Sequence, residues 1–199
     1  METSTKKKFD TRTMVRVSIL GLMGYMLLEF NMRLPIFPMF IKLDVANLPS
    51  IIASITMGPV AGLGVEFVKN VIKAMISSET IGIGEISNFI CGVSLVIPLG
   101  LVYKKLPNTK GYIIGSVAGV LTLCVIASVS NYFFVIPAYA LAMGGMDAVI
   151  NMASAANANI TDLNALIVFA FIPFNFIKGM LNVVLGYMIY KFVKPLFMM

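Results

Sequence analysis

The sequence predicts an all-α integral membrane protein with six transmembrane helices and both termini in the cytoplasm. Of the 199 residues, 59% are hydrophobic and only 12% are charged, and the mean hydropathy is +0.93. Soluble domains carry about 25% charged residues, so lipid must be the solvent of this chain. The apolar runs are long and continuous rather than alternating, which selects helices over barrel strands. Basic residues gather at the ends of these runs.

The chain begins with a charged tail, residues 1–12, followed by a span over residues 13–30. The tail has no cleavage site behind a short apolar core, so we expect a cytoplasmic tail rather than a removed signal peptide. A proline-broken loop, NMRLPIFPMFIKLD, follows the span.

The next apolar stretch, residues 45–77, could form one helix or two. A single helix of about 33 residues would be roughly 50 Å long, too long for a hydrocarbon core of about 30 Å. The stretch also contains Gly58-Pro59, a turn signal. We therefore expect a short span over residues 47–57 and another over residues 59–77.

Three further spans complete the membrane domain, which covers residues 13–193: they are expected at 84–103, 111–136 and 163–190. Pro137 is expected to divide the charge-free stretch that contains the fifth span. A polar loop over residues 137–162 then leads into the last span, and residues 194–199 form a C-terminal tail.

The distribution of basic residues supports six spans rather than five. Six spans place most of them on the side of both termini, whereas five would scatter the basic loops over both faces, so the positive-inside rule makes that side cytoplasmic. The basic residues on it are Lys6, Lys7, Lys8, Arg12, Arg16, Lys104, Lys105, Lys110, Lys191 and Lys194. The long loops 31–46 and 137–162 are then external, and long loops are where we look for a site.

Composition argues against an enzyme and against nucleic-acid binding. The chain has no histidine, and its two cysteines, Cys91 and Cys124, have no metal or redox spacing. No GxxxxGK[ST] loop is present, so ATP hydrolysis would have to come from a partner. The net charge of +6 is explained by topology rather than by nucleic acid.

The presence of ionisable residues within the spans requires a structural or functional explanation, because inserting each into the membrane costs roughly 2.5–3.5 kcal/mol. Glu66 and Lys69 stand three residues apart and share a helix face, so they can form a structural pair. The alternative is that Lys69 or Lys73 faces a ligand cavity.

Lys178 lies near the middle of the last span, in FIPFNFIKGML, with no acidic residue nearby on its helix. Asn175 shares its face, and Pro173 can kink the helix by freeing the carbonyl of Phe169. Snorkelling works near helix ends, so we expect Lys178 to face a ligand.

Asn88 and Asn131 lie near the outer ends of their spans. A side-chain amide in lipid needs hydrogen-bond partners, because burying it without them costs free energy. Hydrogen bonds between helices are one interpretation of each. The other is that these asparagines, with Asn175 and Lys178, line one cavity open to the outside.

Several segments together carry a family resemblance. They are PIFPMFIKLDVANLPSIIASITMGPVAGLGVEFVKN, GEISNFICGVS, the NYF at residues 131–133 and PFNFIKG. In order and over essentially the whole chain, they resemble the riboflavin-specific substrate-binding subunits (S components) of energy-coupling factor (ECF) vitamin transporters.

The resemblance implies a non-catalytic subunit that binds riboflavin from outside, in the cell membrane of a prokaryote. It implies an ECF transmembrane coupling protein and two ATPase subunits as partners, with riboflavin as transported ligand and no cofactor. Whether FMN also binds is left open, as is whether the energising module is dedicated or shared.

The resemblance also implies site residues. Asn131, Asn175 and Lys178 would grip the flavin edge, since an amide offers a donor beside an acceptor. The other ligand-binding candidates are Lys42, Leu43 and Asp44 in the first outer loop, and Asn88.

Family members often carry Ala-x-x-x-Ala on the first span as the docking face for the coupling protein. Ser18 and Leu22 occupy those positions here. Ser18 suits a small-residue contact, whereas Leu22 departs from the pattern, and Gly21 is the substitute candidate.

Three other interpretations remain. The same architecture could bind another vitamin, although the thiamin-binding relatives rely on tryptophan and this chain has none. A membrane enzyme acting on lipid would require a cluster of acidic or histidine residues at the membrane face. Asp44, Asp147 and Asp162 do not form such a cluster in the sequence. A structural membrane scaffold would differ from a transporter subunit by not co-purifying with ATPases.

Overall fold

A computed structural model describes residues 10–80 and 82–197; for residues 193–197 only the backbone is considered. Residues 1–9 of the expected N-terminal tail and residues 198–199 of the expected C-terminal tail lie outside the described residues. The described chain is helical, with one isolated bridge between Met32 and Leu43. Its elements are α1 (Thr11–Glu29), α2 (Leu48–Met57), α3 (Pro59–Ile76), α4 (Ile83–Lys105), α5 (Thr109–Ser130), η1 (Asn131–Val135), α6 (Ile136–Met143), α7 (Met146–Ser154), α8 (Leu163–Leu166), η2 (Ile167–Phe171) and α9 (Ile172–Phe197), where η marks a π-helical turn.

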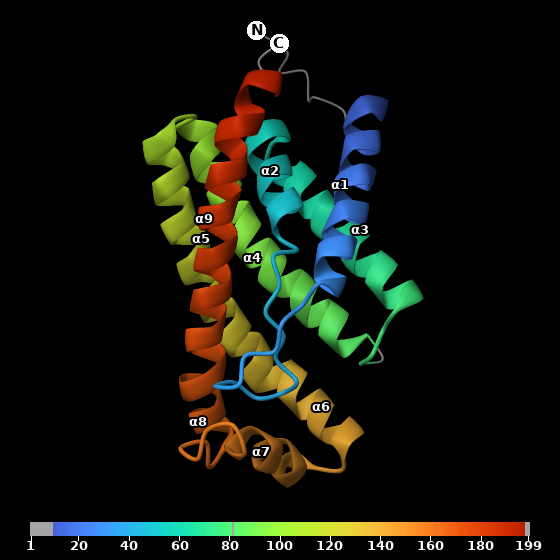
Figure 1. The fold of residues 1–199 in the computed structure, drawn as a ribbon, viewed down its shortest axis with the longest axis vertical. Coiled ribbons are helices and arrows are strands. Elements are labelled where there is room, and N and C mark those ends of the chain that lie inside the picture. Colours follow the sequence, from blue (N-terminus) through green and yellow to red (C-terminus); the bar gives the residue numbers. More distant parts are fainter. Residues whose placement is uncertain (1–9, 81, 198–199) are drawn as a thin grey trace, which may run out of the picture.

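Successive segments of the bundle run in alternate directions (Figure 1). The start of α1, the α4–α5 connection and the end of α9 lie at one end of the molecule, and α6, α7 and α8 lie at the other. The loop between α1 and α2 crosses the front of the bundle between these ends. We name the end with the start of α1 the inner end and the opposite end, which carries the long connections, the outer end, after the topology expected from the sequence.

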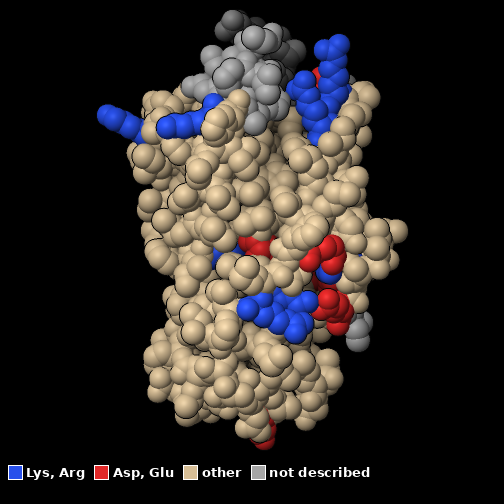
Figure 2. Space-filling view, viewed as in Figure 1, with Lys and Arg blue, Asp and Glu red and all other residues tan. Residues whose placement is uncertain are grey.

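Three helices are long and apolar enough to cross a membrane, judged by length and composition over the described residues. They are Ile83–Lys105, the continuous helix Thr109–Met143 and Leu163–Phe192, and Leu48–Met57 is a shorter apolar helix. Exposed apolar residues follow the outward face of α5 at helical spacing: Ile113, Val117, Leu121 and Val125. Figure 2 shows basic side chains at the inner end and, below them on the same face, a band without charged side chains that ends at a mixed acidic and basic cluster. A face of this kind suits lipid.

Local residues explain where the helices begin. Asp10 caps α1 by accepting a hydrogen bond from the backbone N–H of Thr13 at 2.8 Å, and Asn108 caps α5 in the same way. Gly58 has a φ of +102°, which favours glycine, and Pro59 occupies the first helical position of α3. The expected break between the second and third helices is confirmed.

Pro137, in contrast, does not end a helix. The helix continues through it to Met143, after the π-helical turn Asn131–Val135, and a second π turn, Ile167–Phe171, precedes Pro173. A wider turn before a proline accommodates its missing N–H, so the helix continues without a break. The expected loop 137–162 is therefore largely helical, and a π turn precedes Pro173, where a kink was expected.

The interior contains two large apolar clusters. The outer cluster joins the α1–α2 loop to α6, α7, η2 and the start of α9, with Phe37, Ile136 and Phe171 among its members. The inner cluster joins α2, α4, α5 and α9, with Leu95, Leu99 and Tyr112 among its members. A smaller cluster lies between α1, α2 and α3.

Candidate functional site

A cavity of about 390 Å³ opens within the outer half of the bundle. Its volume lies within the range of pockets for small molecules, roughly 300–1,000 Å³. The loop 31–46, residues 79–80 and 84–91, the η1–α6 region and the η2–α9 region supply its walls. Apolar side chains make up part of the lining, and they include Phe40, Val135, Ile136, Phe171 and Phe174. Such a lining suits a flat apolar ligand that also carries polar groups.

The cavity brings together most of the side chains that the sequence singled out. Six of the seven predicted ligand-binding residues line it: Lys42, Asp44, Asn88, Asn131, Asn175 and Lys178. Leu43 does not line it, and instead packs against the outer apolar cluster while its backbone pairs with Met32. The predicted shared void therefore exists, whereas the binding role of these residues stays a prediction.

Asn131 and Asn175, which both line the cavity, are held in equivalent ways. The Asn131 amide donates to the Ala127 carbonyl at 2.7 Å, and the Asn175 amide donates to the Phe171 carbonyl at 2.8 Å. Each bond fixes a side chain against its own helix beside a π turn. Each amide still has one N–H and its carbonyl oxygen for a ligand.

Lys178 has an acidic partner that its own helix could not reveal. Its ammonium lies 2.7 Å from the Asp44 carboxylate, and the two side chains are 9% and 3% exposed. Asp44 comes from the loop before α2, 134 residues away in the chain. Lys178 therefore reaches the cavity as half of a neutral pair, and not as the isolated cation that its surroundings on α9 suggested.

Asn88 presents an unpaired acceptor at the cavity wall. Its Oδ1 atom is buried and has no donor among the described residues. Buried polar atoms are nearly always paired, so such an atom asks for an explanation. A ligand N–H or O–H in the cavity would supply the missing donor.

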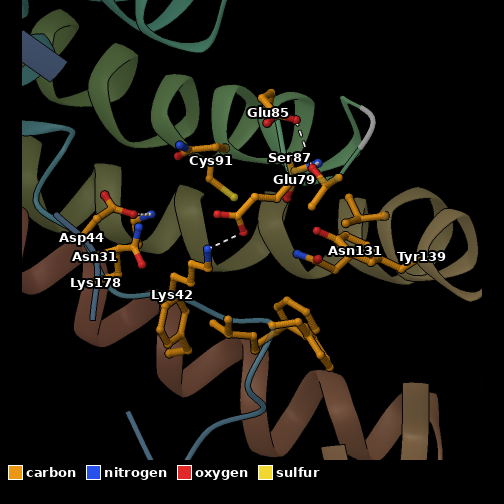
Figure 3. Close-up of a pocket in the computed structure, with 18 of the residues that line it drawn as sticks. Asn31, Lys42, Asp44, Glu79, Glu85, Ser87, Cys91, Asn131, Tyr139 and Lys178 are labelled. Atoms are coloured by element: carbon orange, nitrogen blue, oxygen red, sulfur yellow. Dashed lines mark hydrogen bonds and ion pairs between the residues drawn. The ribbon is translucent and has the colours of Figure 1, made fainter. Parts of the chain in front are cut away.

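Charged pairs surround the mouth of the cavity. Lys42 reaches Glu79 at 2.6 Å (Figure 3), and Lys73 reaches Glu29 at 2.9 Å. Figure 2 shows a mixed cluster of acidic and basic side chains on the face that the α1–α2 loop crosses. The hydrogen bond and charge of Lys42 hold the pKa of the Glu79 carboxyl below its ordinary value. These pairs tie the loop and α1 to the end of α3 and to the segment that follows it.

The two lysines of α3 have different places. Lys73 lies at the mouth of the cavity, as one alternative expected. Lys69 is paired with Glu66 at 2.7 Å, both side chains are fully buried, and neither lines the cavity. The structural pair that helical spacing predicted for Glu66 and Lys69 is confirmed.

Sequence reasoning missed several lining residues that cluster before and within the first turns of α4. Glu85 is buried and accepts a hydrogen bond from Thr80 at 3.0 Å, and the Tyr139 ring also lines the cavity. Glu85 stands in the first turn of α4, where an acidic side chain suits the helix N-terminus, so nothing local in the sequence distinguishes a cavity role from that helix-terminal role. No cluster of three or more His, Cys, Asp or Glu side chains that could hold a metal occurs in the described part of the chain.

The three candidate docking residues of α1 do not share one surface. Ser18 is exposed and Leu22 is 46% exposed, so both face outward. Gly21 is buried against Val68 of α3, where a Cβ atom would come within 2.5 Å of the valine side chain. Gly21 therefore serves the α1–α3 contact, and its expected place on the docking face is corrected.

Comparisons with known proteins agree with the geometry. The chain matches the family described as "ECF transporter, substrate-specific component" over residues 12–190. It is 31% identical to the riboflavin transporter FmnP of Bacillus subtilis, over 92% of this chain and 93% of that one. It is 29% identical to the riboflavin transporter RibU of Staphylococcus aureus, over 92% of this chain and 90% of that one.

A solved structure has the same fold. It is described as the S component of a bacterial ECF transporter, and it superposes with a TM-score of 0.75 at 25% sequence identity. The match covers 93% of this chain and 96% of that one.

Proposed function

This chain belongs to the family of substrate-specific components of ECF transporters, and on that premise we propose that it binds riboflavin and delivers it to an energising partner. One observation carries the proposal: amides from three separate segments, Asn88, Asn131 and Asn175, face one cavity together with Lys178. The relatives named as riboflavin transporters support the choice of ligand.

The chemistry of the cavity suits the vitamin. Isoalloxazine has a flat apolar body, which Phe171, Phe174 and Ile136 can cover. Its pyrimidine edge alternates donors and acceptors, and an asparagine amide offers one of each side by side. The free amide groups of Asn131 and Asn175 and the unpaired oxygen of Asn88 match such an edge.

The proposal includes topology and partners. The chain would cross the bacterial plasma membrane six times with both termini inside, and riboflavin would enter between the outer loops. Alternate helix directions and the basic inner end support this orientation. A transmembrane coupling protein and two ATPase subunits would supply energy, with the α1 face around Ser18 and Leu22 as the docking surface.

A direct binding experiment tests the ligand. The chain, purified in detergent, is titrated with riboflavin while flavin fluorescence is followed, and thiamin serves as the control vitamin. We expect saturable riboflavin binding at one site per chain and none of thiamin. A linear, unsaturable riboflavin signal would refute the proposal. A parallel titration with FMN decides whether a phosphate on the ribityl end is tolerated.

A further inference from the structure

A second buried ion pair lies behind the cavity and takes no part in its lining. Glu66 and Lys69 of α3 approach to 2.7 Å, and both side chains are fully buried. Ser50 of α2 donates a hydrogen bond to the same Glu66 carboxylate. The pair therefore sits between helices, out of reach of a ligand.

The Lys69 ammonium also reaches beyond its carboxylate partner. It donates to the side-chain oxygen of Asn47 at 2.9 Å and approaches the carbonyl oxygen of Ala46 at 3.5 Å. These two residues connect the outer loop to α2. Asn47 stands at the N-cap of α2, but its side chain makes no capping hydrogen bond there. Its side-chain oxygen accepts a hydrogen bond from Lys69 instead.

The same short segment is held from the opposite side by α9. Lys178 pairs with the Asp44 carboxylate at 2.7 Å, and Asn182 donates to the Asp44 carbonyl at 3.1 Å. The other Asp44 carboxylate oxygen accepts from the Ala46 amide at 3.1 Å. Residues 44–47 are thus held between a buried lysine of α3 and a buried lysine of α9.

Helix α1 closes a third side. A Cβ atom on Gly24 would come within 3.1 Å of the Lys69 side chain and 3.3 Å of the Ala46 carbonyl oxygen. The lysine stem and the segment therefore have no spare room on this side.

Stability alone is a weak reason for a charged pair at this place. Desolvation of two charges commonly offsets their attraction, and well-packed apolar residues can replace a buried pair at little cost. What an apolar replacement cannot reproduce is the hydrogen bonding from Lys69 to Asn47 and Ala46.

We propose that Lys69 is a positioning residue for the ligand site, acting through segment 44–47 to hold the Asp44 carboxylate against Lys178. The inference rests on the proposed function, because the cavity at which Asp44 and Lys178 meet is the proposed riboflavin site. Lys69 touches no ligand, and its whole effect on binding passes through Asp44.

A matched set of variants isolates the Lys69 contacts. Glu66→Gln keeps the lysine, whose amine still donates to Asn47 and Ala46, whereas Glu66→Gln/Lys69→Met removes those bonds without leaving a buried carboxylate unpaired. Asn70→Leu is the control for polarity, because within the described part of the chain buried Asn70 bonds only to the Glu66 carbonyl of its own helix. All four proteins, wild type included, are purified in detergent and checked for folding by thermal unfolding.

Hydrogen exchange without ligand gives the first readout. We expect the peptide covering residues 44–47 to exchange about tenfold faster in Glu66→Gln/Lys69→Met than in Glu66→Gln, because Ala46 loses the geometry of its bond to Asp44. Wild type and Asn70→Leu should match Glu66→Gln. Equal exchange rates in the two Glu66 variants would overturn the positioning role, whatever the riboflavin affinities of these variants are.

Riboflavin affinity in a double-mutant cycle gives the second readout. Adding Lys69→Met to Glu66→Gln should weaken riboflavin binding about tenfold. Adding Lys69→Met to the double variant Glu66→Gln/Asp44→Asn should weaken riboflavin binding by less than about twofold. A merely structural lysine would give equal losses in both backgrounds, and that result would also overturn the proposal. If wild type binds no riboflavin, the proposed function fails, while the exchange comparison still decides whether Lys69 holds the segment.

Discussion

The inner and outer halves of this bundle are built on different principles. The inner half packs helix on helix: Gly115 and Gly119 of α5 lie directly against backbone atoms of Leu99 and Leu95 on α4. The outer half keeps its helices apart with two π turns, a loop and two small helices, and the space between them is the cavity. Close packing is hard to deform, whereas a lined cavity leaves polar atoms for a ligand.

The difference between the halves predicts how each responds to mutation. A change in the outer half should act mainly on riboflavin binding, and a change in the inner half mainly on stability. The variant expected to have the largest effect breaks this rule, because it affects both.

Lys178→Met should have the largest effect. It leaves the Asp44 carboxylate buried without a cation, which typically costs about 3–5 kcal/mol. We expect a marked fall in the thermal unfolding midpoint in detergent, together with loss of saturable riboflavin binding.

The double variant Asp44→Asn/Lys178→Met separates these two effects. It removes both charges at once, so most of the stability should return while riboflavin binding stays weak. Full recovery of binding in the double variant would show that the ion pair serves packing alone.

Gly119→Val tests the inner half and should come next in size. A Cβ atom at this position would lie 2.4 Å from the Leu95 carbonyl oxygen, so α5 has to move away from α4. Overpacking of this kind costs about 1–3 kcal/mol. The unfolding midpoint should fall while the riboflavin affinity of the folded fraction is unchanged, as measured by titration at low temperature. A specific loss of affinity with normal stability would contradict the division into halves.

Asn175→Ala should affect binding more than stability. Among the described residues, the wild-type amide bonds only to the Phe171 carbonyl of its own helix segment, so its loss breaks no hydrogen bond between helices there. A lost hydrogen bond to a ligand typically costs about 1 kcal/mol or somewhat more, which predicts roughly tenfold weaker riboflavin binding. Fluorescence titration measures the affinity, and circular dichroism verifies the fold.

Asn88→Leu provides the contrast, because it removes a buried oxygen that has no donor in the described structure. The protein should be no less stable than wild type and should bind riboflavin more weakly. Unchanged affinity in both asparagine variants would remove these amides from the binding site.

Features of the structure that depend on nearby residues could be predicted from the sequence. The Glu66–Lys69 pair follows from a spacing of three residues, and the break at Gly58-Pro59 follows from turn chemistry. The asparagines of the cavity stood out because an amide in an apolar helix needs a reason. Each of these signals can be recognised from residues that lie close together in the sequence.

Features that depend on distant residues could not be predicted in the same way. The partner of Lys178 lies 134 residues away, and no periodicity connects α9 with the α1–α2 loop. The helix continues through Pro137 because a π turn precedes it, and the helix propensities of the residues do not predict that turn. Gly21 was a candidate for the docking face because small residues serve contacts within the bundle and contacts with partners equally well, and only the structure shows it against Val68.

The smallest effect is expected at the mouth of the cavity, from Glu79→Gln. The Lys42–Glu79 pair is partly exposed, at 25% and 58%, and exposed pairs contribute below about 1 kcal/mol. Because the pair ties the outer loop to the segment before α4, its loss should speed riboflavin release by less than about fivefold, measured by stopped-flow fluorescence. High salt should screen the wild-type pair and narrow the difference between the two proteins.

The pH dependence of release has a definite sign. Lys42 lowers the pKa of Glu79, so the pair is fully formed above the ordinary carboxyl pKa and is lost as the pH falls through the lowered value. Wild type should therefore release riboflavin as fast as Glu79→Gln only at acid pH, while the variant lacks this titration. If the two proteins differ equally at every pH and salt concentration, Glu79 acts through packing, and the charges at the mouth do not hold the loop.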